Sequence, residues 1–242
     1  MEQSAVQELL ARLMALESDV RYQAPASDGE AEFRHQPGHI PVLLSAPHGA
    51  VHRREGRLKE EDEYTAAMAR LVAKRTGAHA LYVRRRSPTD PNWYRDVPYK
   101  QRLREVIEQG AVRFVLDLHA AAPSRAFGIA LGTMVGESCP HHRQAIIRTL
   151  EQGGFRREGQ GIDRLDVDET FTALGRAGQE TITRYVWEGL HVPAAQLEFH
   201  PCLRVAERRA DATSSVPFHG DPMHIARAIR VLVDLVQLTA SS

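Results

Sequence analysis

Apolar residues in this 242-residue chain follow two patterns, helix-like spacing and short continuous runs. The helix-like spacing predicts helices over residues 2–18, 61–76, 98–109, 140–152, 179–189 and 219–239. The continuous runs predict strands over residues 41–46, 80–83, 112–118, 128–132 and 192–197, with an edge strand near Phe33. Strands that alternate with helices are typical of a largely parallel sheet covered on both faces. The pattern therefore predicts an α/β fold.

The chain length fits a single domain over residues 1–242. Within that domain, residues 1–38 are expected to form an N-terminal helix and a polar loop appended to the sheet. Residues 159–180 are rich in Gly, Asp and Thr, a composition that predicts a functional loop or lid. The sequence contains neither an internal repeat nor a low-complexity tract.

Composition narrows the class of protein without identifying it. With 43% apolar and 26% charged residues the chain resembles an ordinary globular protein, and its formal net charge of zero gives no field that favours nucleic acid or an anionic membrane. Cys139 and Cys202 form no CxxC pair, which excludes a disulfide framework and a cysteine-rich zinc knuckle. The chain starts without a basic signal segment, and no stretch approaches the ~20 apolar residues of a spanning helix. We expect a cytoplasmic protein that binds neither nucleic acid nor a membrane, with its oligomeric state left open.

Three of the predicted strands end on a residue that can bind a metal or transfer a proton. His48 follows the first core strand, His119 follows the strand of residues 112–118, and Glu198 follows the strand of residues 192–197. In an open α/β sheet the carboxyl ends of the strands line one crevice, so these side chains should converge. Two imidazoles and a carboxylate in one crevice suggest a zinc hydrolase.

A catalytic zinc takes three protein ligands and keeps one position for water, whose pKa falls to about 7. Beside His48 and His119, the third ligand should be a carboxylate. Residues 60–63 form an acidic cluster after the His48 loop, although an acidic first turn is also common in helices that bind no metal. Asp117 lies two residues before His119 and should point to the same side of its strand, where it would orient that imidazole or stabilise a neighbouring loop.

The segments SAPHGA, EEDEYT, DPN and DLHA, in this order, resemble those of the N-formylglutamate amidohydrolase family. The resemblance runs from about residue 41 to about residue 204. It implies the phosphorylase/hydrolase-like, zinc carboxypeptidase-like fold, with one domain and a mixed, mostly parallel sheet between helices on both faces. It also implies a small acylated amino acid or short peptide as the substrate.

The same resemblance implies one zinc ion per chain, bound by His48, His119 and an acidic residue of the cluster 60–63. The register of the family's aspartate-led segment favours Asp62 as the third ligand. Glu61 is the alternative to Asp62.

The resemblance and the nearness in sequence to His119 and Glu198 suggest further residues that take part in the reaction. Glu198, in the segment AAQLEFH, resembles the glutamate that acts as general base in such enzymes. Arg125 and Arg204 lie close in sequence to His119 and Glu198, so either would stabilise an oxyanion or bind a carboxylate. Tyr94 and Tyr99 are further oxyanion donors or, equally, ordinary loop aromatics.

A second group of residues lies in the segment RRRSPTDPNW. Arg86, Asp90 and Asn92 are similar to the family's residues that bind the substrate carboxylate and shape the site, with Asp90 behind the metal ligands. The family often places an arginine after the asparagine, whereas this chain has Trp93. An apolar surface there predicts weaker binding of a dicarboxylic substrate unless Arg95 compensates.

The sequence therefore predicts a zinc-dependent amidohydrolase that cleaves an amide bond of a small N-acyl amino acid similar to N-formylglutamate. A metallo-carboxypeptidase or a γ-glutamyl-type peptidase is the alternative among hydrolases. A non-catalytic module that binds carboxylates is the alternative from another class. The acyl group and the amino acid stay open at this point.

Overall fold

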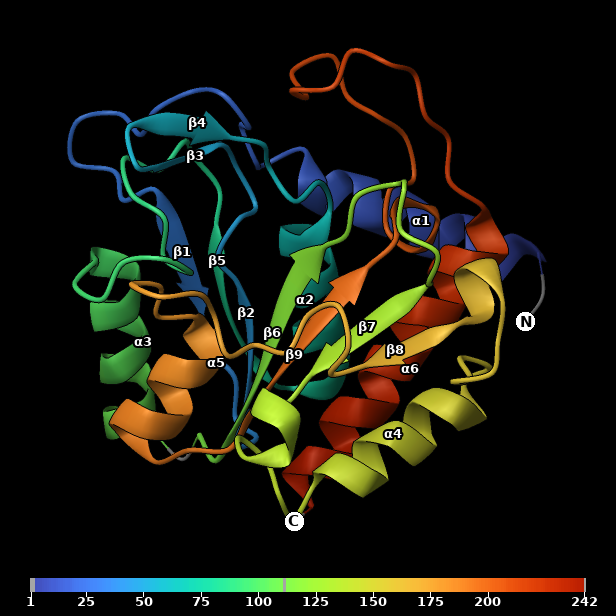
Figure 1. The fold of residues 1–242 in the computed structure, drawn as a ribbon. Helices are drawn as coiled ribbons and strands as arrows, with labels where there is room; N and C mark the ends of the chain where they lie inside the picture. Colours follow the sequence, from blue (N-terminus) through green and yellow to red (C-terminus); the bar gives the residue numbers. More distant parts are fainter. Residues whose placement is uncertain (1–2, 111, 242) are drawn as a thin grey trace.

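The computed structural model of the protein describes residues 3–110 and 112–241, and a seven-stranded sheet runs through its centre (Figure 1). The strands are β1 (Phe33–Gln36), β2 (Val42–Ala46), β5 (His79–Val83), β6 (Phe114–Ala120), β7 (Ile129–Gly132), β8 (Leu165–Val167) and β9 (Ala194–Phe199). Their order is β1-β5-β2-β6-β9-β7-β8. The four strands β5, β2, β6 and β9 run parallel, while β1 is antiparallel to β5 and β7 to β9. This confirms the predicted mixed, mostly parallel sheet.

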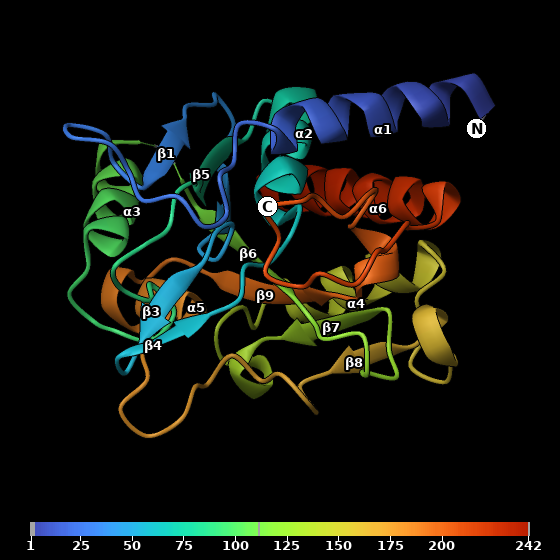
Figure 2. The same ribbon diagram turned by 90° about the horizontal axis from the view of Figure 1, so that it is seen from above.

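Helices cover both faces of the sheet, as Figure 2 shows from above. One face carries α2 (Thr65–Thr76) and α6 (Pro222–Ala240), with α1 (Gln3–Glu17) packed on both. The other face carries α3 (Pro98–Gln109) and the short α5 (Ile182–Arg184). A further helix, α4 (Arg143–Gln152), packs against α6. The α/β architecture with helices on both faces is thus confirmed. None of the described helices is long and apolar enough to cross a bilayer.

The central strands are apolar because both of their faces are covered. Every residue of β2 and of β9 is buried, as are the first six residues of β6. Such continuous runs are typical of parallel strands inside an α/β sheet. Polar residues within them, such as Asp117, His119 and Glu198, must therefore find partners inside the fold.

The chain order creates a crevice beside β2. From β2 the chain passes through α2 to β5 on one side, and then returns through α3 to β6 on the other side. The carboxyl ends of β2 and β6 thus flank a topological switch point, where open α/β sheets bind their ligands. His48 follows β2 and His119 lies near the end of β6, so the fold brings the two histidines to this crevice.

Several predicted boundaries were wrong. The helix predicted from residue 61 begins at Thr65, because Tyr64 has a left-handed φ of 66° that interrupts the helical path. The acidic cluster 60–63 consequently lies in a loop and not in a first helical turn. The helix predicted over residues 179–189 is one α-helical turn followed by the π-helix Tyr185–Gly189. Residue 2 of the predicted first helix lies outside the described residues.

One strand and one hairpin were not predicted. One is β8, which lies inside the segment predicted to be a loop over residues 159–180. The other is a hairpin of β3 (His52–Arg54) and β4 (Arg57–Lys59), joined by Glu55 and Gly56 with φ of 49° and 77°. Positive φ at both loop residues matches the twist of paired strands. The strands have three residues each and are mostly polar, so they carry no apolar alternation to detect.

Candidate metal centre and active-site cleft

His48 is placed by the tight turn that follows β2. A Cβ on the next residue, Gly49, would lie 2.2 Å from the carbonyl oxygen of Val83 and 2.9 Å from Cβ of Ala66. Only glycine allows β5 and α2 to approach this closely. The turn thereby holds His48 at the crevice, where the residue is buried, with 6% of its surface exposed.

Asp62 is tied to the same turn by its backbone. Its amide N–H donates to the carbonyl oxygen of His48 at 2.7 Å. The carbonyl of Asp62 in turn accepts from the amide and the hydroxyl of Thr65 at 3.1 and 2.7 Å, which starts α2. The side chain of Asp62 is therefore fixed beside the imidazole of His48.

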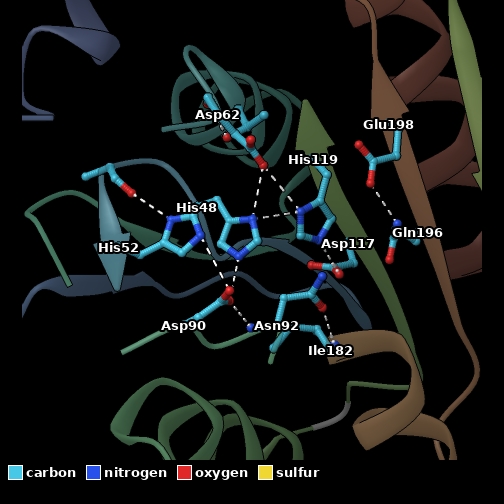
Figure 3. A network of polar contacts seen from close by, with 12 residues as sticks. His48, His52, Asp62, Asp90, Asn92, Asp117, His119, Ile182, Gln196 and Glu198 are labelled. Carbon is cyan, nitrogen blue, oxygen red and sulfur yellow. Dashed lines mark hydrogen bonds and ion pairs between the residues drawn. The ribbon is translucent and has the colours of Figure 1, made fainter. Parts of the chain in front are cut away.

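Three ligand atoms converge at the crevice, as Figure 3 shows. Nδ1 of His48 and Nδ1 of His119 lie 3.2 Å apart, and Oδ2 of Asp62 lies 3.3 Å from each. A tetrahedral zinc with bonds of about 2.0–2.1 Å separates its ligand atoms by about 3.3 Å. The near-equilateral triangle has the dimensions of one face of such a site.

Each imidazole is oriented by a carboxylate on its other nitrogen. Nε2 of His48 lies 2.8 Å from Oδ1 of Asp90, and Nε2 of His119 lies 2.8 Å from Oδ2 of Asp117. Both carboxylates are fully buried and accept a hydrogen bond from the N–H at Nε2 of their ring. In the neutral rings this leaves the Nδ1 lone pairs facing each other and Asp62, which is the pattern of histidines that bind zinc.

The donor set fits a divalent cation. Oδ2 of Asp62 is buried and receives no hydrogen bond from the described residues, although it lies between two imidazoles. The carboxylates also favour a positive charge at this position. Burial lowers the pKa of His48, but Asp90 and Asp62 raise it to about 9. For Asp62, burial raises the pKa, but His119 and His48 hold it below its ordinary value. A cation bound by His48, Asp62 and His119 would satisfy all three groups.

A neighbouring cluster fits a cation less well. His48, His52 and Asp90 also bring three ligand atoms together, and the rings of His48 and His52 stack with centroids 4.0 Å apart. Oδ2 of Asp90 already accepts from Nε of Arg54, and Oδ1 accepts from His48 and from the amide of Asn92. A second cation there would face the guanidinium at close range. The first cluster is therefore the better candidate for a metal position.

Glu198 lies beside this centre on the adjacent strand. It is the cross-strand neighbour of His119 in the β6–β9 register, and the residue is buried, with 6% of its surface exposed. Oε1 accepts a hydrogen bond from Nε2 of Gln196 at 2.8 Å. Burial raises the pKa of Glu198 to about 7, moderated by His119. A carboxyl group with this pKa can both accept and donate a proton near neutral pH.

A cleft of about 810 Å³ is lined by His48, Asp62, His119, Gln196 and Glu198. One wall is the β3–β4 hairpin and the other is the loop of residues 170–181, part of the segment predicted to be a functional loop. Cationic side chains in the lining are Arg54, Lys59, Arg125 and Arg176. The guanidinium of Arg125 lies 5.3 Å from the ring centre of Phe171.

Several residues proposed from the sequence lie elsewhere. Glu61 accepts from the amide of Thr213 at 2.7 Å and from its hydroxyl, so its carboxylate turns away from the two histidines. Arg86 is exposed and lines a separate depression with Arg53. Nε of Arg204 donates to the carbonyl of Phe199, so this side chain holds the end of β9 and does not line the cleft.

The predicted aromatic donors also have other partners. The hydroxyl of Tyr94 accepts from the amide of Glu55 at 2.7 Å. The hydroxyl of Tyr99 is buried and donates to the carbonyl of Leu81 at 2.8 Å, and it lies 3.0 Å from Oγ of Ser45. Neither tyrosine lines the cleft.

The turn of residues 90–95 joins the candidate metal centre to the cleft wall. Asn92 lines the cleft, but its Oδ1 accepts from the amide of Ile182 at 2.7 Å and its carbonyl accepts from Gln179 at 2.9 Å. Arg95 is exposed and pairs with Glu180 at 3.2 Å. Asn92 thus fastens the wall to the turn that carries Asp90, whereas Arg95 adds only a solvent-exposed ion pair.

Sequence reasoning missed three groups of the cleft: His52, Arg54 and Gln196. The first two belong to the β3–β4 hairpin, whose only local signal was a glycine two residues after Arg54. Gln196 has the same strand parity as Glu198, so the alternation of side chains along β9 would have placed both on one face.

Comparison with known proteins gives matches at the level of structure. An N-formylglutamate amidohydrolase from Ralstonia eutropha has a TM-score of 0.53 and 16% identity over 88% of this chain and 98% of that chain. A bacteriophage poly-γ-glutamate hydrolase has a TM-score of 0.51 and 13% identity, over 86% and 91%. A Zn-dependent exopeptidase from Parabacteroides distasonis has a TM-score of 0.52 and 9% identity, over 96% and 97%. No protein-family model and no curated protein sequence matches the chain.

These likenesses concern the fold. At 9–16% identity they show that the chain has the zinc carboxypeptidase-like α/β fold, as the sequence predicted. The chemistry of the protein depends on the side chains of the site, because one fold carries many activities.

Proposed function

We propose that the protein is a zinc-dependent amidohydrolase that cleaves an amide bond of a small N-acyl amino acid similar to N-formylglutamate. The observation that carries the proposal is the triangle of His48, Asp62 and His119 beside the carboxyl group of Glu198. The similarity in fold to an N-formylglutamate amidohydrolase and to a Zn-dependent exopeptidase supports it.

In this proposal His48, Asp62 and His119 hold the metal, and Asp90 and Asp117 keep the two imidazoles oriented. A bound zinc would polarise the scissile carbonyl and lower the pKa of water at the site. Glu198 accepts the proton of the attacking water and then donates it to the leaving nitrogen, as general base and then acid. Gln196 fixes the carboxyl group for both transfers by its hydrogen bond to Oε1.

A γ-glutamyl-type peptidase or a metallo-carboxypeptidase is the second candidate. The cleft of about 810 Å³ has room for more than one small amino acid, since typical ligand pockets start at about 300 Å³. The similarity in fold to a poly-γ-glutamate hydrolase agrees with a longer substrate.

The test compares the wild type with Glu198→Gln after both are loaded with zinc. The substrates are N-formyl and N-acetyl amino acids and short α- and γ-linked peptides. Glu198→Gln should retain zinc and lose about two to four orders of magnitude in turnover, because the base is removed and the shape is kept. Normal turnover by this variant would exclude Glu198 as the base. A wild type that binds carboxylates and hydrolyses none of the panel would favour a non-catalytic binding module.

A further inference from the structure

Arg54 is held on two sides at the wall of the cleft. Its Nε donates to Oδ2 of Asp90 at 2.5 Å, and its guanidinium carbon lies 4.9 Å from the ring centre of Trp93. The side chain lines the cleft and is 25% exposed. Among the described residues, its two terminal amino groups have no hydrogen-bond partner. The guanidinium is thus fixed in place with two donors left over.

Two terminal amino groups on one plane match the two oxygens of a carboxylate. A guanidinium binds a carboxylate through two parallel N–H···O bonds, and this geometry is specific to arginine. The ion pair with Asp90 and the contact with Trp93 restrict the side chain before any ligand arrives, which lowers the entropic cost of binding. Arg54 therefore has the properties of a preorganised anion site.

The position of Arg54 relative to the metal centre supports this assignment. The two oxygens of Asp90 lie against His48 on one side and Arg54 on the other. Asp90 thereby links the guanidinium to His48 of the metal centre. Asp90 is not one of the three residues that supply the ligand atoms. Lys59, in the same hairpin, adds positive charge to this wall. Arg86, the carboxylate-binding residue expected from the sequence, lines a different depression.

We propose that Arg54 binds a carboxylate of the substrate, and that Trp93 acts on substrate choice by supporting Arg54 and not by touching the substrate. Trp93 is absent from the residues that line the cleft, which agrees with a supporting position. The tryptophan that replaces the expected arginine after Asn92 is then the platform for an arginine supplied by the hairpin. This inference rests on the proposed function, since it assigns the anchor of the same substrate.

The experiment measures ligand binding by titration calorimetry in zinc-loaded Glu198→Gln, which should hydrolyse the ligands about two to four orders of magnitude more slowly than the wild type. N-acetyl-L-glutamine carries only the α-carboxylate, N-acetyl-L-isoglutamine carries only the side-chain carboxylate, and N-acetyl-L-glutamine amide carries neither. Arg54→Ala should lower the affinity for the ligand whose carboxylate Arg54 binds by about ten- to a hundredfold. The affinity for the neutral amide should not change. The ligand that loses affinity identifies which carboxylate Arg54 binds.

Three further variants separate recognition from structural support. Arg54→Lys keeps a positive charge beside Asp90 but lacks the planar fork, so most of the affinity should still be lost. Trp93→Leu should cost about two- to fivefold through the lost ring contact. Arg57→Ala is the matched control: it removes an exposed charge from the cross-strand neighbour of Arg54, outside the cleft lining, and should change nothing.

The outcomes distinguish this inference from the proposed function. Unchanged carboxylate binding in Arg54→Ala and Arg54→Lys, with full zinc content, overturns the inference, even if the wild type hydrolyses N-acyl amino acids. Carboxylate binding that depends on Arg54, in a wild type without hydrolytic activity, supports the inference and overturns the proposed function. Loss of affinity for the neutral amide together with the carboxylate ligands would show that Arg54 only supports the fold. This result also overturns the inference.

Discussion

Asp90 fixes the ring of His48 by accepting from Nε2 at 2.8 Å, while Nδ1 of the same ring faces Asp62 at 3.3 Å. The carboxylate sits at the start of the turn that holds both Arg54 and the wall of the cleft. Asp90, which lies behind the proposed metal site, thus links His48, Arg54 and the wall of the cleft.

We predict that Asp90→Asn weakens zinc binding by about ten- to a hundredfold, the usual effect of losing the carboxylate behind a histidine ligand. Asp117→Asn should do the same through His119. Zinc affinity can be measured by competition with a chromophoric chelator. Asp163→Asn is the control, because its carboxylate pairs with Arg227 outside the cleft lining and should leave the affinity unchanged.

The third metal ligand is testable by a pair of adjacent substitutions. Asp62→Ala should abolish stoichiometric zinc, because it removes one corner of the triangle. Glu61→Ala should keep the zinc and lose only the contacts with Thr213. Elemental analysis of the two purified variants decides between them. Zinc retained in Asp62→Ala and lost in Glu61→Ala would reverse the assignment.

The sequence predicted the fold and the meeting of His48, His119 and Glu198 because buried parallel strands have an unmistakable apolar signature. Their carboxyl ends necessarily share one crevice. The position of Asp117 followed from strand parity alone, and the structure places its carboxylate 2.8 Å from the imidazole of His119.

What the sequence left open depends on contacts between distant segments. Asp62 faces the two imidazoles while Glu61 accepts from Thr213, and the loop that carries them ends at Tyr64, whose amide donates to the buried carboxylate of Glu17 at 2.8 Å. No local pattern records a contact 47 positions away. Arg54 escaped notice for a similar reason, since its role depends on how a short polar hairpin folds back onto Asp90 and Trp93.

Acid should destabilise the protein partly through His35 on the edge strand β1. Burial, together with Arg102, lowers the pKa of His35 to about 4, and Nδ1 faces an amino group of Arg102 at 3.3 Å. In the unfolded chain histidine titrates near 6.5, so between about pH 6.5 and 4 the unfolded state binds more protons and stability falls as the pH falls. Since the side chain is partly exposed, we expect its share to be about 1 to 2 kcal/mol.

His35→Phe should keep the stacked ring contact with His79 and remove the titrating group. Urea unfolding of the wild type and the variant at pH 7.5 and pH 4.5 measures the effect. The stability lost on acidification should be smaller in the variant by the amount given above. Equal losses in the two proteins would show that His35 does not contribute.

The wall of the cleft should depend on one buried cation. Lys100 is 1% exposed, and its Nζ donates to the carbonyls of Tyr94 and Glu180 at 2.9 and 2.7 Å and to the carboxylate of Glu180 at 3.0 Å. Lys100→Met keeps the length of the side chain but leaves these acceptors without their donor, so we expect a loss of about 3 kcal/mol in the free energy of unfolding.

The matched control acts on the same carboxylate from the solvent side. The side chain of Arg95 is 86% exposed and pairs with Glu180 at 3.2 Å, so Arg95→Met should cost at most about 1 kcal/mol. Because Glu180 belongs to the loop that forms the wall, Lys100→Met should also raise KM more than it lowers kcat, whereas Arg95→Met should leave both near the wild-type values. Urea unfolding and steady-state kinetics on the best substrate of the panel check both parts. Similar small effects of the two substitutions would mean that the loop holds its position without the buried lysine.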